Sequence, residues 1–202
     1  MSNWTCTQQQ DAAVAILTTR DDILVFLSCG FGKTLYYLAP LAPSPCDFTV
    51  VVVPYVALME SQMAYGINVL GLHCVAFDKT SPLFAPNAFV DLHSRAQDST
   101  RFVFVVTETA VQPHTLELLR AAASHGLLNS IAVDKTHQVL LSQDYRTSLE
   151  RIRLLKTLAV RLVLAVDLIK NRSRTWLNER RPVLVLGMHD AEKESVANTG
   201  AQ

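Results

Sequence analysis

Residues 22–34 read DILVFLSCGFGKT, and this stretch decides the fold prediction. Its first part, 22–27, is an apolar run typical of a buried strand, and a glycine-containing loop follows at once. The segment 33–39 then has helical character, so a strand leads through a glycine loop and Lys-Thr into a helix. Gly30 and Gly32 let successive backbone N–H groups curl toward an anion, and the start of the helix adds positive charge. The stretch therefore predicts a phosphate-binding loop.

The side chains of this loop have complementary chemistry. The ammonium of Lys33 would contact β- and γ-phosphate oxygens, and the hydroxyl of Thr34 would bind Mg²⁺. Cys29 precedes Gly30 in this loop, and Phe31 lies between Gly30 and Gly32. The general GxxxxGK[ST] pattern is not met, because Leu27 stands at its first glycine position. A glycine turn that binds nothing remains the alternative.

The rest of the chain alternates between apolar runs and helix-like segments. The runs predict strands at 22–27, 48–53, 72–76, 101–106, 130–134 and 160–166, and PVLVLGM at 182–188 is a candidate for a last strand. Helices are predicted at 8–19, 33–39, 55–70, 109–124 and 145–157, and a loop at 78–99. Near-continuous apolar strands are typical of a parallel sheet that is covered on both faces. The pattern therefore predicts a doubly wound α/β domain.

Composition excludes several classes of protein. Half of the 202 residues are apolar, which excludes disorder for most of the chain, and 18 basic residues balance 18 acidic ones. This balance excludes nucleic-acid binding by bulk charge, although basic residues are concentrated in 145–181. The four cysteines form no CxxC pair, the N-terminus lacks a secretory pattern, and the least charged stretch, 35–59, contains Asp47 and four prolines. We expect an intracellular domain without a membrane span.

A second acidic motif lies in NSIAVDKTHQVLL, residues 129–141. Asp134 ends an apolar strand and is well placed to hold Mg²⁺, although it could simply cap the following turn. Lys135 follows it at the position where a nucleotide-hydrolysing site needs a catalytic Glu. A lysine cannot accept a proton at neutral pH unless its pKa is strongly depressed, and losing a general base costs about 10²–10⁴ in rate.

Four stretches carry a family resemblance. Residues 8–41, QQQDAAVAILTTRDDILVFLSCGFGKTLYYLAPL, resemble the opening of RecQ-like DNA helicases within the DEAD/DEAH-box superfamily, most of all the RecQ-like sequences of fungal genomes. Residues 49–62, TVVVVPYVALMESQ, are similar to motif Ia of that family. Residues 131–155 resemble its DExH box followed by an Asp-aromatic-Arg element, and 103–110 resemble the intervening strand. The resemblance implies a single RecA-like P-loop domain with a mostly parallel sheet and helices on both faces.

The resemblance also assigns roles to residues of this chain. It implies ATP and Mg²⁺ as cofactors, with Gln10 reading adenine and His137 coupling hydrolysis to movement. The implied nucleotide site consists of Gln10, Cys29, Gly30, Phe31, Gly32, Lys33 and Thr34, with Thr34 and Asp134 on the metal. The implied nucleic-acid contacts are Pro54, Tyr55, Ala57, Leu58, Thr107, Glu108 and Arg146.

The chain departs from the family pattern in three places. The box reads DKTH instead of DExH, residues 165–167 replace the Ser/Thr-Ala-Thr motif, and the resemblance covers 8–169 without a second lobe and its arginine finger. We expect 170–202 to be a partly disordered extension. The expected function is binding of ATP, Mg²⁺ and nucleic acid as part of an ATP-dependent 3′-to-5′ DNA helicase, with little or no intrinsic turnover. The alternative is a catalytically dead interaction or regulatory module, or a decayed helicase fragment.

The expected partners follow from the same resemblance. They are DNA, single-stranded or at a junction, and a protein that supplies a second lobe. The resemblance is also compatible with a nuclear location.

Overall fold

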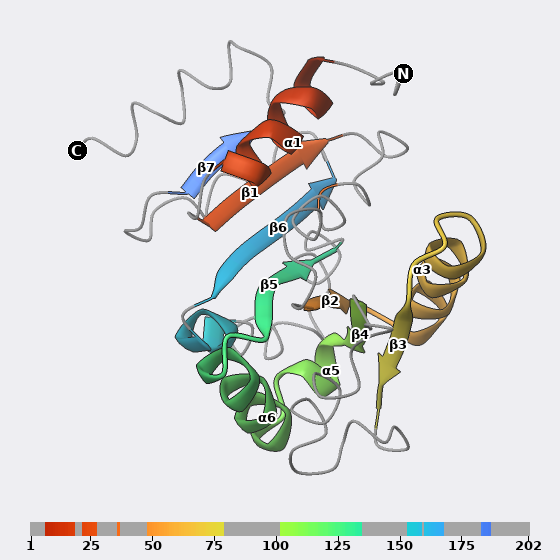
Figure 1. Ribbon diagram of the computed structural model, residues 1–202, viewed down its shortest axis with the longest axis vertical. Helices are drawn as coiled ribbons and strands as arrows, with labels where there is room; N and C mark the ends of the chain where they lie inside the picture. Colours follow the sequence, from red (N-terminus) through yellow and green to blue (C-terminus); the bar gives the residue numbers. More distant parts are fainter. Residues whose placement is uncertain are drawn as a thin grey trace.

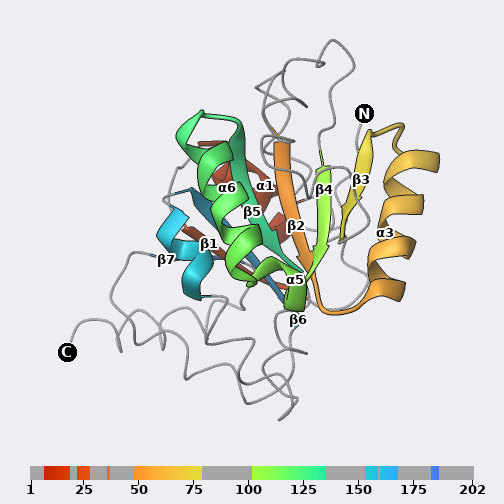
Figure 2. The same cartoon turned by 90° about the horizontal axis from the view of Figure 1, so that it is seen from below.

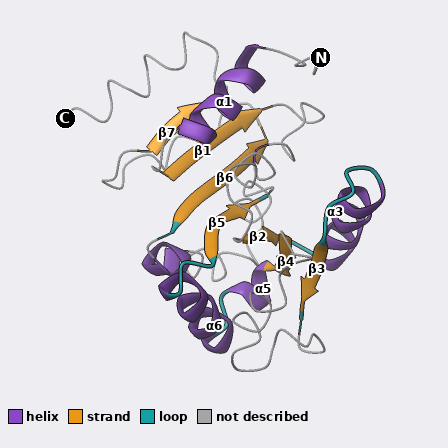
Figure 3. Cartoon of the chain, in the orientation of Figure 1, coloured by secondary structure: helices purple, strands orange, loops and turns teal. Residues whose placement is uncertain are grey.

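The computed structural model describes residues 7–18, 22–27, 36, 48–78, 102–134, 153–158, 160–167 and 183–186. The strands in these ranges are β1 (Asp22–Leu27), β2 (Phe48–Val53), β3 (Cys74–Phe77), β4 (Phe102–Val106), β5 (Leu128–Val133), β6 (Arg161–Asp167) and β7 (Val183–Leu186). The helices are α1 (Thr7–Thr18), α3 (Val56–Asn68), α5 (Thr107–Ala110), α6 (Pro113–Ser124) and the 3-10 helix η4 (Arg153–Leu158). Figure 3 shows the strands gathered in the middle with helices around them.

One seven-stranded sheet organises the fold, with the order β3-β4-β2-β5-β6-β1-β7. Each pairing between these strands is parallel. The carboxyl ends of the strands therefore lie along one edge of the twisted sheet, and Figure 1 shows the arrowheads of β1, β6 and β7 pointing the same way. The predicted parallel sheet is confirmed, and the candidate last strand is β7, paired with β1.

Both faces of the sheet are buried, as the apolar strands require. Strand β2 is buried along its whole length, with Val50 and Val52 in one core and Val51 and Val53 in the other. Helices α6 and η4 contribute to the first core, and α1 and α3 contribute to the second. Figure 2 shows α6 and η4 in front of the sheet and α3 beside the β3 edge.

Some element boundaries differ from the sequence predictions. Strand β3 begins at Cys74, two residues after the predicted start, and β5 begins at Leu128, two residues before it. The predicted helix 109–124 is divided into α5 and α6, because Pro113 starts a new helix and holds Gln112 in an extended conformation. Of the predicted helix 145–157, the structure describes only its end, as η4. The predicted loop 78–99 lies almost entirely outside the described residues.

The turn after α6 delivers the chain directly into β5. Gly126 has a φ of 71°, a left-handed conformation that glycine adopts without strain. The N–H of Leu127 donates to the carbonyl of Ala122 at 3.0 Å, and the N–H of Gly126 donates to that of Ala123 at 3.0 Å. These two bonds close a helix-ending Schellman turn, so β5 starts two residues after the glycine.

The buried hydroxyl of Thr115 gives a stability prediction. Within the described residues, this oxygen in the first turn of α6 has no hydrogen-bond partner. An unpaired buried hydroxyl costs about 1–3 kcal/mol, and valine has nearly the same shape. We expect Thr115→Val to raise the free energy of unfolding by about 1 kcal/mol, as measured by urea denaturation.

The matched control is Thr49→Val. The hydroxyls of Thr49 and Ser130 are 3.1 Å apart in the buried sheet. Valine at position 49 would leave Ser130 unpaired, so stability should fall by about 1 kcal/mol. A loss of stability in Thr115→Val would mean that its hydroxyl has a partner in the folded protein.

Candidate functional site

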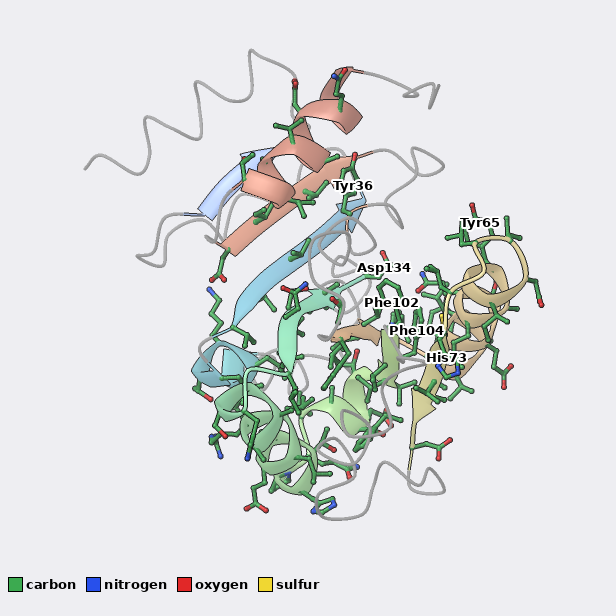
Figure 4. All side chains as sticks on the ribbon, in the orientation of Figure 1. Tyr36, Tyr65, His73, Phe102, Phe104 and Asp134 are labelled. Carbon is green, nitrogen blue, oxygen red and sulfur yellow. The ribbon has the colours of Figure 1, made fainter. Side chains whose placement is uncertain are left out.

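Asp134 lies at the carboxyl edge of the sheet, immediately after β5. Its side chain is only 5% exposed, and Figure 4 shows it beyond the end of that strand. Its backbone N–H donates to the carbonyl of Val52 at 2.9 Å. Its Oδ2 accepts a hydrogen bond from Nε2 of Gln62 at 2.5 Å. The β2 strand and the α3 helix that follows it therefore hold both the backbone and the carboxylate of Asp134.

The neighbouring strand β4 holds the same end of β2 from the other side. The hydroxyl of Thr107, the first residue of α5, donates to the carbonyl of Val53 at 3.1 Å. Consecutive carbonyls of β2 are thus bonded to residues that follow β5 and β4. The turn at Pro54 and Tyr55, which leads into α3, starts from a firmly anchored strand end.

The strand before the predicted phosphate loop ends at the same edge as Asp134. Strand β6 lies between β1 and β5, with Leu27 paired to Asp167 and Val133 paired to Leu164. Because neighbouring strands are about 4.8 Å apart, β1 and β5 are separated by about 10 Å. Val133 and Leu24 are both paired with Leu164, so β1 continues three residues beyond the level of Val133. The loop residues Cys29 to Thr34 lie outside the described residues, so their roles remain predictions.

Tyr36 is the one described residue of the predicted helix 33–39. It is helical and fully buried in the core that contains Ile23 and Val25 of β1. This burial makes Tyr36 a core residue. Figure 4 shows Tyr36 near the carboxyl ends of β1 and β6.

The residues predicted to contact nucleic acid fall into two groups. Tyr55 and Ala57 are exposed at the start of α3, Leu58 is partly buried, and Pro54 is buried. Tyr55 is the N-cap of α3, and its side chain makes no capping hydrogen bond. The first N–H groups of the helix therefore have no acceptor in the Tyr55 side chain. Exposed N–H groups at a helix start attract anions, which suits a phosphate backbone.

The second group lies at α5. Glu108 is exposed, whereas Thr107 is fully buried and its hydroxyl is bonded to Val53. Thr107 can therefore influence a ligand through the end of β2, which it holds, but not by direct contact. Gln10 is exposed on α1. Arg146, Lys135 and His137 lie outside the described residues.

The described residues fit a magnesium ion held mainly by phosphates. Magnesium prefers oxygen ligands and usually takes one or two carboxylates together with phosphates and water. Asp134 supplies a carboxylate, and Oε1 of Gln62 beside it is buried without a hydrogen-bond partner in the described part of the chain. That part contains no cluster of three or more potential metal-ligating His, Cys, Asp or Glu side chains. The described residues alone therefore do not form a complete protein cage for a metal.

Sequence reasoning missed the contact of Gln62. This residue belongs to the quoted run 49–62, but it lies 72 positions before Asp134. The available signal was its place on the helix that follows β2, because strands ending at one edge bring the following segments together.

The parallel sheet and the buried carboxylate at its carboxyl edge define the class of protein. It is a RecA-like α/β domain of the kind found in helicase ATPase cores. The sequence model of the DEAD/DEAH box helicase family matches residues 7–166, and the chain belongs to that family. It is 27% identical over 154 residues to the ATP-dependent DNA helicase Q5 of Mus musculus, covering 74% of this chain and 15% of that protein. It is 28% identical over 153 residues to the ATP-dependent DNA helicase Q-like 2 of Arabidopsis thaliana, covering 74% and 21%.

A solved structure confirms the fold. The crystal structure of the DUF1998 helicase MrfA bound to DNA and AMPPNP superposes with a TM-score of 0.60 at 15% identity, covering 90% of this chain and 27% of that one. The resemblance to RecQ-like helicases is therefore confirmed, and the chain is a helicase domain related to ATP-dependent DNA helicases. It spans less than a quarter of the length of these relatives. Among the helices described, none is long and apolar enough to cross a membrane.

Proposed function

We propose that this chain is a helicase ATP-binding lobe that binds ATP with Mg²⁺ and contacts nucleic acid. The observation that carries the proposal is the buried carboxylate of Asp134, which lies at the carboxyl edge of the sheet after β5, two strands away from β1. Family membership supports the same ligands.

The nucleotide would lie between the ends of β1 and β5. The backbone N–H groups of loop 28–34 would hold the phosphates, with the Lys33 ammonium on the terminal ones and Gln10 reading adenine. Thr34 and Asp134 would hold Mg²⁺, which neutralises phosphate charge when bound. Burial of Asp134 supports this assignment because a site with little water strengthens charge interactions.

Nucleic acid would bind along the start of α3. The exposed N-terminal turn with Tyr55 and Ala57 offers N–H groups to a phosphate and an aromatic side chain to a base. Glu108 and Arg146 would line the same surface. Single-stranded or junction DNA, unwound in the 3′-to-5′ direction together with a partner that supplies a second lobe, is the substrate that we infer. An intracellular, nuclear place of action is part of this proposal.

Low turnover is the most specific part of the proposal. Lys135 stands beside Asp134 where a general base is needed, and an arginine finger from a second lobe contributes about 10³–10⁵ in turnover. The lysine also favours a second candidate: a catalytically dead interaction or regulatory module, or a decayed fragment, that uses the fold as a surface. The two candidates differ in nucleotide binding, which only the first requires.

An ATPase assay with and without single-stranded DNA tests the turnover. We expect the wild-type chain to stay near background, and Lys135→Glu to remain within about 10-fold of it, because a restored carboxylate does not replace the finger. The control is Lys156→Glu, an exposed lysine of η4 that makes the same charge change elsewhere. Strong DNA-stimulated turnover by the wild type would contradict the proposal, and strong activation by Lys135→Glu would identify the charge reversal as the limiting defect.

A further inference from the structure

We propose that Gln62 is a positioning residue that orients the Asp134 carboxylate toward Mg-nucleotide and couples this carboxylate to nucleic acid bound at the start of α3. The inference rests on the proposed function, because it concerns the same site. It gives a role toward Asp134 to a residue that the resemblance places only in motif Ia, on the nucleic-acid side.

The first support is the geometry of the contact. Nε2 of Gln62 donates to one carboxylate oxygen of Asp134, while the backbone N–H of Asp134 is bonded to Val52. The backbone bond places the residue, and the contact with Gln62 is made by the carboxylate itself. The amide of Gln62 therefore restricts which way the carboxylate oxygens face.

The second support is the setting of the amide. Oε1 of Gln62 is buried and makes no hydrogen bond in the described part of the chain, although buried polar atoms nearly always find a partner. If Gln62 served only to hydrogen-bond the carboxylate through Nε2, burying Oε1 without a partner would cost stability and bring no benefit. Together, Oε1 of Gln62 and the carboxylate of Asp134 place several oxygen atoms at this end of the sheet, and hard cations such as Mg²⁺ prefer oxygen ligands.

The third support is the position of Gln62 on α3. It lies one helical turn after Leu58, on the helix whose first turn carries the exposed Tyr55 and Ala57. One turn of a helix is a rigid spacer of about 6 Å. A ligand that shifts the start of α3 would therefore shift the amide, and with it the carboxylate. Coupling of this kind is reciprocal, so Mg-nucleotide must change nucleic-acid affinity by the same factor.

The test measures nucleotide binding instead of activity. Gln62→Met and Gln62→Leu remove the donor at similar volume, and Ser61→Ala, an exposed neighbour on α3, is the control. Binding of ATP is titrated against Mg²⁺ concentration and repeated in EDTA. We expect the Mg²⁺ concentration for half-maximal ATP binding to rise about 10-fold in both variants, because losing a contact that orients a metal ligand weakens metal affinity by about that factor. The ATP affinity measured in EDTA should stay unchanged.

The coupling has its own measurement. The affinity for a single-stranded oligo-dT is determined with and without Mg-ATP, and the ratio should move toward 1 in both variants but not in Ser61→Ala. Wild-type Mg²⁺ dependence in both variants would overturn the inference alone. Equal weakening with and without Mg²⁺, together with a lower melting temperature, would show a merely structural residue and also overturn it. A wild-type chain that binds no ATP would refute the proposed function, and the inference would fall with it.

Discussion

Replacing Lys33 with alanine is expected to abolish the stabilisation that Mg-ATP gives to the wild-type chain. A ligand at 100 times its dissociation constant stabilises a folded protein by about 2.7 kcal/mol. For a domain of this size, that free energy raises the melting temperature by roughly 5–10 °C. Without the Lys33 ammonium the phosphates lose their main positive partner, so the shift should approach zero. Thermal denaturation with and without Mg-ATP measures the difference.

The control for this experiment is Lys156→Ala. Lys156 is exposed on η4, so its removal changes net charge equally while leaving the nucleotide shift at the wild-type value. No shift in the wild-type chain would favour the dead interaction module. A full shift in Lys33→Ala would mean that nucleotide binds elsewhere, since a phosphate loop without its lysine cannot hold ATP equally well.

The second large effect concerns the packing of α3 against β3. A Cβ atom added at Gly66 would lie 2.9 Å from Sγ of Cys74, closer than such atoms normally approach. Cys74 is buried, and burial raises the pKa of its thiol to about 11, so this side chain is a neutral, packed group at physiological pH. Overpacking of a core costs about 1–3 kcal/mol. Because alanine is favoured over glycine in a helix by about 1 kcal/mol, we expect Gly66→Ala to lower the free energy of unfolding by a net amount of up to about 2 kcal/mol in urea denaturation.

The sign of this effect should reverse when the sulfur is removed. In a Cys74→Ala background the added methyl group has room, and alanine is favoured over glycine in a helix by about 1 kcal/mol. Gly66→Ala should therefore stabilise the double variant relative to Cys74→Ala alone. Stabilisation in both backgrounds would show that the thiol turns away without cost, and that the close approach does not constrain α3.

Several features of the fold could be predicted because they depend on local patterns. The apolar runs that became β2, β4 and β6 were located to within a residue of their ends, since burial on both faces leaves a continuous apolar signature. Boundaries failed where local geometry overrides that signature. Pro113 divides the predicted helix 109–124 because proline favours the first turn and forces an extended residue before it.

The candidate site could be predicted only in part. Asp134 was identified because a carboxylate that ends an apolar strand is conspicuous, and the structure describes it as buried at the predicted edge. Thr107 was expected to face nucleic acid from its motif alone. Its burial and its bond to Val53 depend on how β4 lies beside β2, which no local pattern encodes.

The amino-acid order by itself therefore determined that this is a parallel α/β domain of a helicase family, and that Lys135 follows Asp134 at the end of a strand. These properties depend on short stretches of sequence, in which the residue types and the spacing of apolar residues determine strand, helix and loop. Only the tertiary structure decided that Gln62 reaches Asp134 and that β2 is held from both sides. Such contacts join residues 54 to 82 positions apart, and their existence depends on strand order, which adjacent residues do not specify.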